Sequence, residues 1–176
     1  GLAIAGFLAL MLAVLIMPNH WIISLIAFPL AMIHAFRWKN WYHIKVWKIT
    51  LLWPLYISYA FMILGMFLYG FVGLNILNES LAIHALAAGG IGLLCSSIMA
   101  RISLGHTNRN VFQAPKMVIV VFALLTITTV FRVIMPIIDP AHYTLWMQLS
   151  QWGWIIGFMM LTIVYWPILT KPSPVK

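Results

Sequence analysis

Acidic residues are almost absent from this chain. Glu79 and Asp139 are the only two among 176 residues, whereas Lys and Arg together number 10. Charged residues make up 7% of the sequence and hydrophobic residues 64%, against about a quarter and about half in a soluble domain. So few charged side chains cannot cover a surface that faces water. The lipid bilayer is therefore the expected solvent and partner of the chain.

Cysteine is equally scarce. The single Cys95 excludes an intrachain disulfide and any zinc or iron–sulfur site built from cysteines, and it is most simply a packing residue. No catalytic Ser-His-Asp set, carboxylate pair, phosphate loop or zinc motif is present. The chain starts at Gly1, already inside an apolar run with no basic segment before it, so this run is not a signal peptide. We expect the chain to begin partway into a longer protein.

Long apolar runs occupy most of the sequence. A bilayer core needs about 20 apolar residues per helix. Six runs meet or approach this length, at residues 2–17, 21–36, 49–74, 81–100, 117–135 and 145–169. We therefore predict an all-α, polytopic transmembrane helical bundle of about six spans that forms a single domain over residues 1–176. Pro29 predicts a kink in the second span, whereas Pro54 falls near the start of the third, where proline is better tolerated.

The charges predict the orientation of the bundle. With six spans, nearly all basic residues fall on one side of the membrane and both acidic residues on the other. The basic residues on that side are Arg37, Lys39, Lys45, Lys48, Arg101, Arg109, Lys116, Lys171 and Lys176. The positive-inside rule makes this side cytoplasmic and places both termini there. The net charge of +8 then requires no nucleic acid as a partner.

The fourth predicted span has a histidine near its start, His84, and another just past its end, His106. They are 22 residues apart, or about 33 Å in a continuous helix, so they cannot bind the same metal. An ionisable residue inside a span suggests function, and neutral imidazole is the usual axial ligand of haem. His84 is a candidate metal ligand on the outer side, and His106, with His34, on the inner side. Alternatively, His84 bonds a neighbouring helix and His34 is merely interfacial.

Small residues follow His84 along the same helix. Ala88, Gly92 and Cys95 form a stripe at helical spacing, which lets a helix or a flat cofactor approach the backbone closely. At the far end, Gly105 is placed to end the helix in the left-handed conformation.

Three arginines are candidates for binding an anionic group. Arg132 lies inside the fifth predicted span, where an arginine must pair or snorkel. Pairing with Asp139 would make it structural, whereas pairing with a haem propionate would mark a cofactor site at the depth of His84. Arg101 and Arg109 flank the polar turn after the fourth span and either bind an anion or snorkel to the interface.

The stretch HALAAGGIGLLCSSIMARISLGHTNR, residues 84–109, resembles the signature of the NnrS family. That signature reads approximately H-A-L-x-x-G-x-I-G, then M-x-R-x-x-L-G-H-T-G-R. The matching residues are His84, Ala85, Leu86, Gly89, Ile91, Gly92, Met99, Arg101, Leu104, Gly105, His106, Thr107 and Arg109, and Asn108 replaces a glycine. Shorter matches flank this stretch in the same order as in the family, at residues 37–38, 52–53, 59–60, 131–133 and 165–169.

This resemblance implies a bacterial inner-membrane protein that contains haem and copper and takes part in the response to nitric oxide. It strengthens His84 and His106 as metal ligands, with Arg132, Arg101 and Arg109 near a cofactor. Family members are about twice as long, so the chain resembles the C-terminal half of a protein of about twelve spans. Further ligands then lie in the N-terminal half or in a second copy.

One residue departs from the family pattern. Tyr56 stands where the family often has histidine, in the context W-x-L-H-x-x-Y-A. Tyrosine can also ligate haem iron, but loss of a ligand is the simpler interpretation.

Two other functions remain open from the sequence. The first is a quinol-linked membrane cytochrome or redox enzyme with two haems stacked across the bilayer. The second is half of a transporter or channel without a cofactor, in which the histidines line a polar path and prolines such as Pro29 and Pro54 break the helices.

Overall fold

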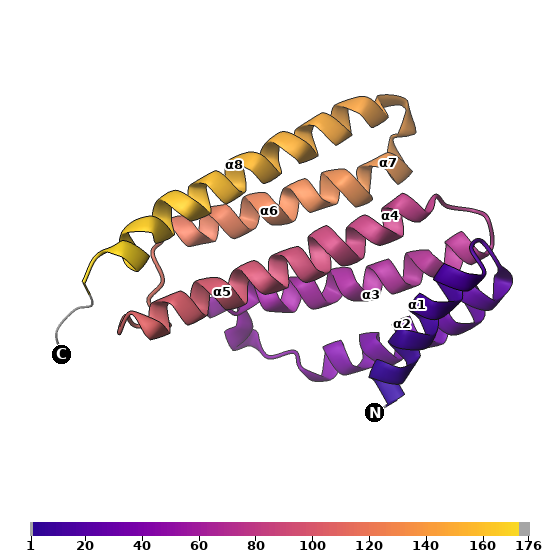
Figure 1. Ribbon diagram of the computed structural model, residues 1–176, viewed down its shortest axis with the longest axis horizontal. Helices are drawn as coiled ribbons and strands as arrows, with labels where there is room; N and C mark the ends of the chain where they lie inside the picture. Colours follow the sequence, from indigo (N-terminus) through magenta and orange to yellow (C-terminus); the bar gives the residue numbers. More distant parts are fainter. Residues whose placement is uncertain (1, 173–176) are drawn as a thin grey trace.

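The computed structural model describes residues 2–172, and this part of the chain is helical without any strand (Figure 1). The regular elements are α1 (Leu2–Ile16), α2 (Trp21–Asn40), η1 (Ile44–Lys48), α3 (Trp53–Gly73), α4 (Glu79–His84), η2 (Ala85–Gly92), α5 (Leu93–His106), α6 (Met117–Val133), α7 (Met135–Ile138), η3 (Pro140–His142) and α8 (Tyr143–Thr170). The prediction of an all-α bundle is confirmed.

Five of these helices are long and apolar enough to cross a bilayer. They are α2, α3, the continuous rod of α4, η2 and α5 (Glu79–His106), α6 with α7 (Met117–Ile138), and η3 with α8 (Pro140–Thr170). The remaining apolar helix, α1, has 15 residues, fewer than the roughly 20 that a span requires. The structure thus has five full-length candidate spans and one short helix, against the six spans expected.

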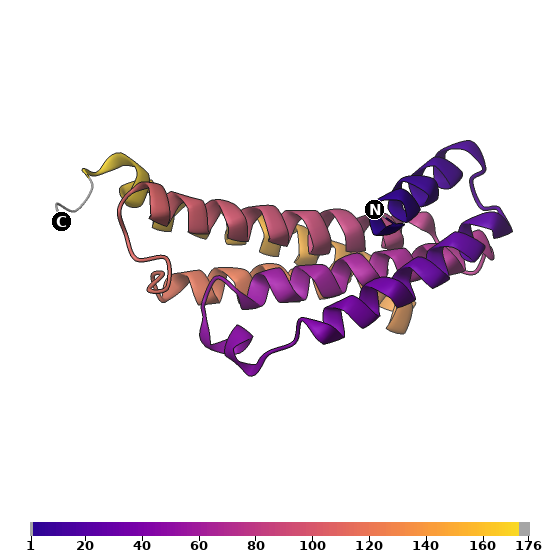
Figure 2. The same ribbon diagram turned by 90° about the horizontal axis from the view of Figure 1, so that it is seen from below.

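The connecting segments gather at two ends of the bundle, as both views show (Figures 1 and 2). Segments 41–52 and 107–116 lie at one end, together with the C-terminal end of α8. Segments 17–20, 74–78 and 134–142 lie at the other end. Most basic residues are in or beside the first set, and both acidic residues are in or beside the second. The structure therefore keeps the predicted separation of charge, and the cytoplasmic placement of the basic end stays a prediction.

Helix α3 lies at the centre of the bundle and packs against α2, η2, α4 and α5. Its contact with α2 is close because small residues meet there: the Ser24 hydroxyl donates to the carbonyl of Gly70 over 2.7 Å. A Cβ atom at Gly73 would lie 2.8 Å from the amide nitrogen of Ser24 and 2.9 Å from the carbonyl oxygen of His20. Backbone therefore packs on backbone, as small residues allow between membrane helices.

The segment after His84 is not a regular α-helix. Ala85–Gly92 is wound as a π-helix, and the amide of Leu93 bonds the carbonyl of Ala88, five residues back. The wider turn rotates Gly89 and Gly90 towards α3, where added Cβ atoms would meet Phe61 and Met62. The α-helical spacing assumed for Ala88, Gly92 and Cys95 is therefore wrong across the π-helix, and Cys95 is exposed.

The predicted helix end at Gly105 is also wrong. Helix α5 continues through Gly105 to His106, and Asn108 instead adopts the left-handed conformation, with φ 54°. The amide of Arg109 bonds the carbonyl of Leu104 over 2.9 Å, which satisfies a terminal carbonyl as in other left-handed helix ends. Asn is the residue besides glycine that most readily takes this conformation.

The prolines do not break the helices that contain them. Helix α2 is continuous through Pro29. Pro54 lies in the first turn of α3, where its missing N–H has no intrahelical partner to lose.

Candidate functional site

A large cavity lies between α1, α2, η1, α3 and α5 and has a volume of about 920 Å³. This is within the range of roughly 300–1,000 Å³ that cofactor and ligand pockets occupy. Its walls are mostly apolar, with a few polar side chains. The lining residues are Ala3, Ile4, Phe7, His34, Arg37, Trp41, His43, Val46, Leu52, Leu55, Tyr56, Tyr59, Met62, Met66, Leu94 and Ile98.

His34 lines this cavity and has one unpaired ring nitrogen. Its Nδ1 lies 2.7 Å from the Tyr59 hydroxyl, and the two rings meet edge to face with centroids 5.7 Å apart. The buried Nε2 has no hydrogen-bond partner among the described residues. Buried polar atoms are normally paired. When Nδ1–H donates to a fixed oxygen, Nε2 carries the lone pair that binds a metal, so this atom is suited to a ligand.

Tyr56 lies in the wall of the same cavity and is 9% exposed. Trp38 stacks on its ring with centroids 4.5 Å apart, and the Trp38 indole N–H donates to the Tyr56 carbonyl over 3.0 Å. Trp38 therefore fixes both the side chain and the backbone of Tyr56. The departure from the family pattern thus falls in the cavity that His34 also lines.

One arginine and a second histidine complete the polar lining. Arg37 is exposed, and its guanidinium carbon lies 5.9 Å from the centre of the Trp41 ring. Arginine at the edge of an apolar cavity suits a carboxylate such as a propionate, because its planar fork can form two parallel hydrogen bonds. His43 is already used structurally: its Nδ1 accepts the Lys45 amide over 3.2 Å and caps η1.

These residues fit haem. The cavity offers volume, apolar walls, an imidazole nitrogen without a partner and an arginine, which are the features a haem site uses. Copper has a weaker basis, since no group of three or more His, Cys, Asp or Glu side chains gathers anywhere in residues 2–172. Met62 and Met66 line the cavity with His34, and thioether and imidazole are ligands that copper accepts.

The predicted outer-side residues, His84 and Arg132, contact each other. The Arg132 Nη2 lies 2.8 Å from the His84 Nε2, and the Arg132 Nη1 contacts the Met147 sulfur. The His84 Nδ1 lies 2.6 Å from the carbonyl oxygen of Ser80. Because a guanidinium only donates, Nε2 is the acceptor and Nδ1 carries the proton. Arg132 thus occupies the nitrogen through which His84 would bind iron.

Asp139 is not the partner of Arg132. Its carboxylate accepts from His142 over 2.9 Å and from the Trp146 indole over 3.2 Å. Partial desolvation raises the pKa of Asp139, but these hydrogen bonds outweigh it and lower the pKa below its ordinary value. The structural alternative for Arg132 therefore involves His84 instead.

We expect the His84–Arg132 contact to contribute measurably to stability. Arg132→Met leaves the His84 Nε2 without a donor, and His84→Leu leaves the guanidinium with Met147 alone, so each should cost about 1–3 kcal/mol. A double-mutant cycle on unfolding in mixed detergent micelles measures the coupling between them. Additive single effects would show that the contact contributes nothing.

The predicted inner-side residues are not brought together. His106 is exposed at the end of α5, whereas His34 lies on α2, and these two helices do not contact each other. Arg109 donates to the carbonyl of Ile168 over 2.9 Å and so fastens the end of α8. The guanidinium carbon of Arg101 lies 5.8 Å from the Phe112 ring centre. A metal-binding role for His106 stays a prediction.

Sequence reasoning named His34 but missed the cavity around it. The signal was present in the aromatic and basic segment 37–48 and in the short family matches at residues 37–38 and 59–60. Only the fold shows that these segments line one cavity, because α2 and η1 both pack against α3.

Comparison with known proteins gives one result. The sequence profile of the family described as NnrS protein matches residues 1–173. No curated protein and no solved structure gives a significant match. The family match covers nearly the whole chain, including the cavity and the His84–Arg132 contact, and the chain therefore belongs to the NnrS family.

Proposed function

We propose that this chain is part of a haem-binding membrane protein of the nitric-oxide response, and that the haem lies in the large cavity with His34 as its axial ligand. The observation that carries the proposal is the buried His34 Nε2, which has no partner among residues 2–172, on a side chain that lines a cavity of about 920 Å³. An imidazole nitrogen left unpaired in an apolar wall costs stability, and iron ligation would remove that cost.

The surrounding residues have separate roles in this proposal. Tyr59 holds the His34 ring through its Nδ1, which fixes the orientation of the ring and so the direction of Nε2. Arg37 binds a propionate where the cavity meets the surface. Trp38 holds Tyr56 in place, and the apolar remainder keeps water away from the cofactor.

Haem in this cavity would supply an iron centre that can bind nitric oxide at a free position. Nitric oxide is small and uncharged and partitions into apolar surroundings, so the bilayer delivers it to a cavity lined by α1, α2, α3 and α5. Copper binding near Met62 and Met66 and location in a bacterial inner membrane belong to the same proposal. Both statements rest on the family match, and copper binding rests in addition on the thioether sulfurs of Met62 and Met66.

The transporter alternative receives less support. The helix breaks expected at Pro29 and Pro54 are not formed. A cofactor-free polar path also leaves the mostly apolar lining of the cavity at His34 unexplained.

The proposal is tested by absorption spectroscopy and metal analysis of the full-length protein, purified in nanodiscs. We expect a haem Soret band that shifts when nitric oxide is added to the reduced protein. A Soret band that stays unchanged when nitric oxide is added would refute nitric oxide as the molecule that the haem binds. Protein that holds no haem after reconstitution with hemin would refute haem as the cofactor.

A further inference from the structure

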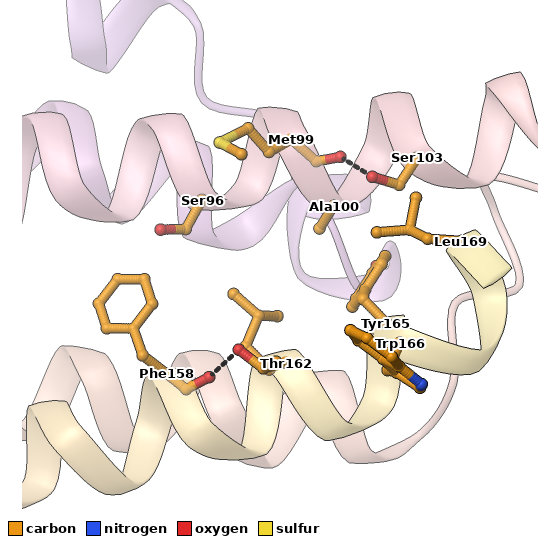
Figure 3. A pocket seen from close by; sticks show the side chains of 10 residues that line it. Ser96, Met99, Ala100, Ser103, Phe158, Thr162, Tyr165, Trp166 and Leu169 are labelled. Carbon is orange, nitrogen blue, oxygen red and sulfur yellow. Dashed lines mark hydrogen bonds between the residues drawn. The ribbon is translucent and has the colours of Figure 1, made fainter.

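A second, smaller cavity lies between α5 and α8, away from the proposed haem cavity. Its volume is about 290 Å³, and its lining residues are Ser96, Met99, Ala100, Ser103, Phe158, Leu161, Thr162, Tyr165, Trp166 and Leu169. Figure 3 shows these side chains between the two helices. The volume is at the lower limit of the roughly 300–1,000 Å³ typical of ligand pockets, so it suits a molecule with one ring rather than haem.

Tyr165 lines this cavity, and its hydroxyl group is an unpaired hydrogen-bond donor. The residue is 6% exposed, and its hydroxyl oxygen is buried without a partner among residues 2–172. The neighbouring hydroxyl groups form no hydrogen bond with it, and each donates to its own helix. Ser103 bonds the Met99 carbonyl and Thr162 the Phe158 carbonyl, both over 2.8 Å (Figure 3). Ser96 bonds the Gly92 carbonyl over 2.7 Å.

The lining restricts the chemistry of a ligand. It contains no Lys, Arg or His, so an anionic acceptor such as a carboxylate or phosphate would enter without a counter-charge at high cost. The acceptor is therefore neutral, and a carbonyl oxygen is the strongest common one. The aromatic rings of Phe158, Tyr165 and Trp166 suit a flat molecule.

The cavity is reached from the lipid side of the bundle. Met99, Trp166 and Leu169 line it and are 67%, 66% and 60% exposed. In a chain with membrane spans, such exposed apolar residues face the acyl chains. A ligand that dissolves in the bilayer can enter between α5 and α8 without crossing water.

We propose that this cavity binds the ring of a membrane quinone, with one ring carbonyl accepting the hydrogen bond of the Tyr165 hydroxyl. The proposal is independent of haem binding, because the two cavities share no lining residue. A phospholipid ester carbonyl offers the same acceptor, and the experiment separates it from a quinone.

The test compares duroquinone with durene, which has the same methylated ring without carbonyls. Binding to the full-length protein in nanodiscs is followed by quenching of tryptophan fluorescence for the quinone and by its competition with durene. Tyr165→Phe should weaken duroquinone binding about 3- to 10-fold and leave durene binding unchanged. Tyr143→Phe, a tyrosine in the first turn of α8, is the matched control and should change neither.

Several results would overturn the proposal. They are the absence of saturable duroquinone binding to the wild-type protein, or equal affinities in wild type and Tyr165→Phe. Duroquinone binding that appears only after delipidation would assign the cavity to a phospholipid and would refute the quinone proposal. Tyr165→Phe should keep or raise the midpoint of thermal unfolding, because it removes an unpaired hydroxyl. A lower midpoint would mean that the hydroxyl has a protein partner.

Discussion

Replacement of His34 by alanine is expected to lower the haem bound per protein by more than about tenfold. Loss of an outer partner of a ligating histidine already costs 10- to 100-fold in metal affinity, so loss of the ligand itself costs at least as much. The substitution also removes the unpaired Nε2, so the fold should remain intact. The ratio of Soret absorbance to protein absorbance after reconstitution measures this effect, and thermal unfolding of the haem-free protein checks the fold.

The matched control is His142→Ala, in the loop before α8. His142 contacts Asp139 and its side chain is 66% exposed, so its loss should not change haem content. Tyr59→Phe keeps His34 and removes only the hydroxyl group that lies 2.7 Å from its Nδ1. This substitution should weaken haem binding less than His34→Ala does. Haem content in His34→Ala equal to that of the control would disprove the ligand assignment.

Gly73→Ala is expected to destabilise the fold by about 2–3 kcal/mol. The new methyl group would lie within 3 Å of two backbone atoms at the start of α2. These atoms are the Ser24 amide nitrogen and the His20 carbonyl oxygen. Backbone atoms cannot rotate away as a side chain can, so α2 and α3 must separate. The free energy of unfolding in mixed detergent micelles measures the effect.

Gly105→Ala serves as the control for Gly73→Ala. Gly105 is also helical, but a Cβ there meets only a Val111 methyl group at 3.8 Å. Because alanine favours helix by up to about 1 kcal/mol, this substitution should be neutral or stabilising. Similar losses at both positions would show that the packing of α2 on α3 is not as tight as described.

The helices were predictable because their apolar runs are long and their ends carry charge or turn residues. What failed depended on local geometry. The π-helix at Ala85–Gly92 changes the number of residues per turn, and no single residue announces it. Gly105 continues the helix because Asn108 can take the left-handed conformation in its place.

The outer-side residues His84 and Arg132 were predictable from their charge and depth, but their pairing with each other was not. A histidine and an arginine at the same membrane depth must find partners, and the structure pairs them with each other. Which partner each one takes depends on how α4 and α6 pack. The cavity at His34 depends on five separate elements, so it follows from the fold and not from any one motif.

The most direct test of the His34 assignment is chemical rescue with imidazole. Hemin is titrated into the full-length protein carrying His34→Gly or His84→Gly, with and without free imidazole. The account predicts that imidazole restores hemin affinity and the Soret position in His34→Gly, whereas His84→Gly binds hemin as the wild type does. Rescue confined to His84→Gly would contradict the account and place the axial ligand beside Arg132.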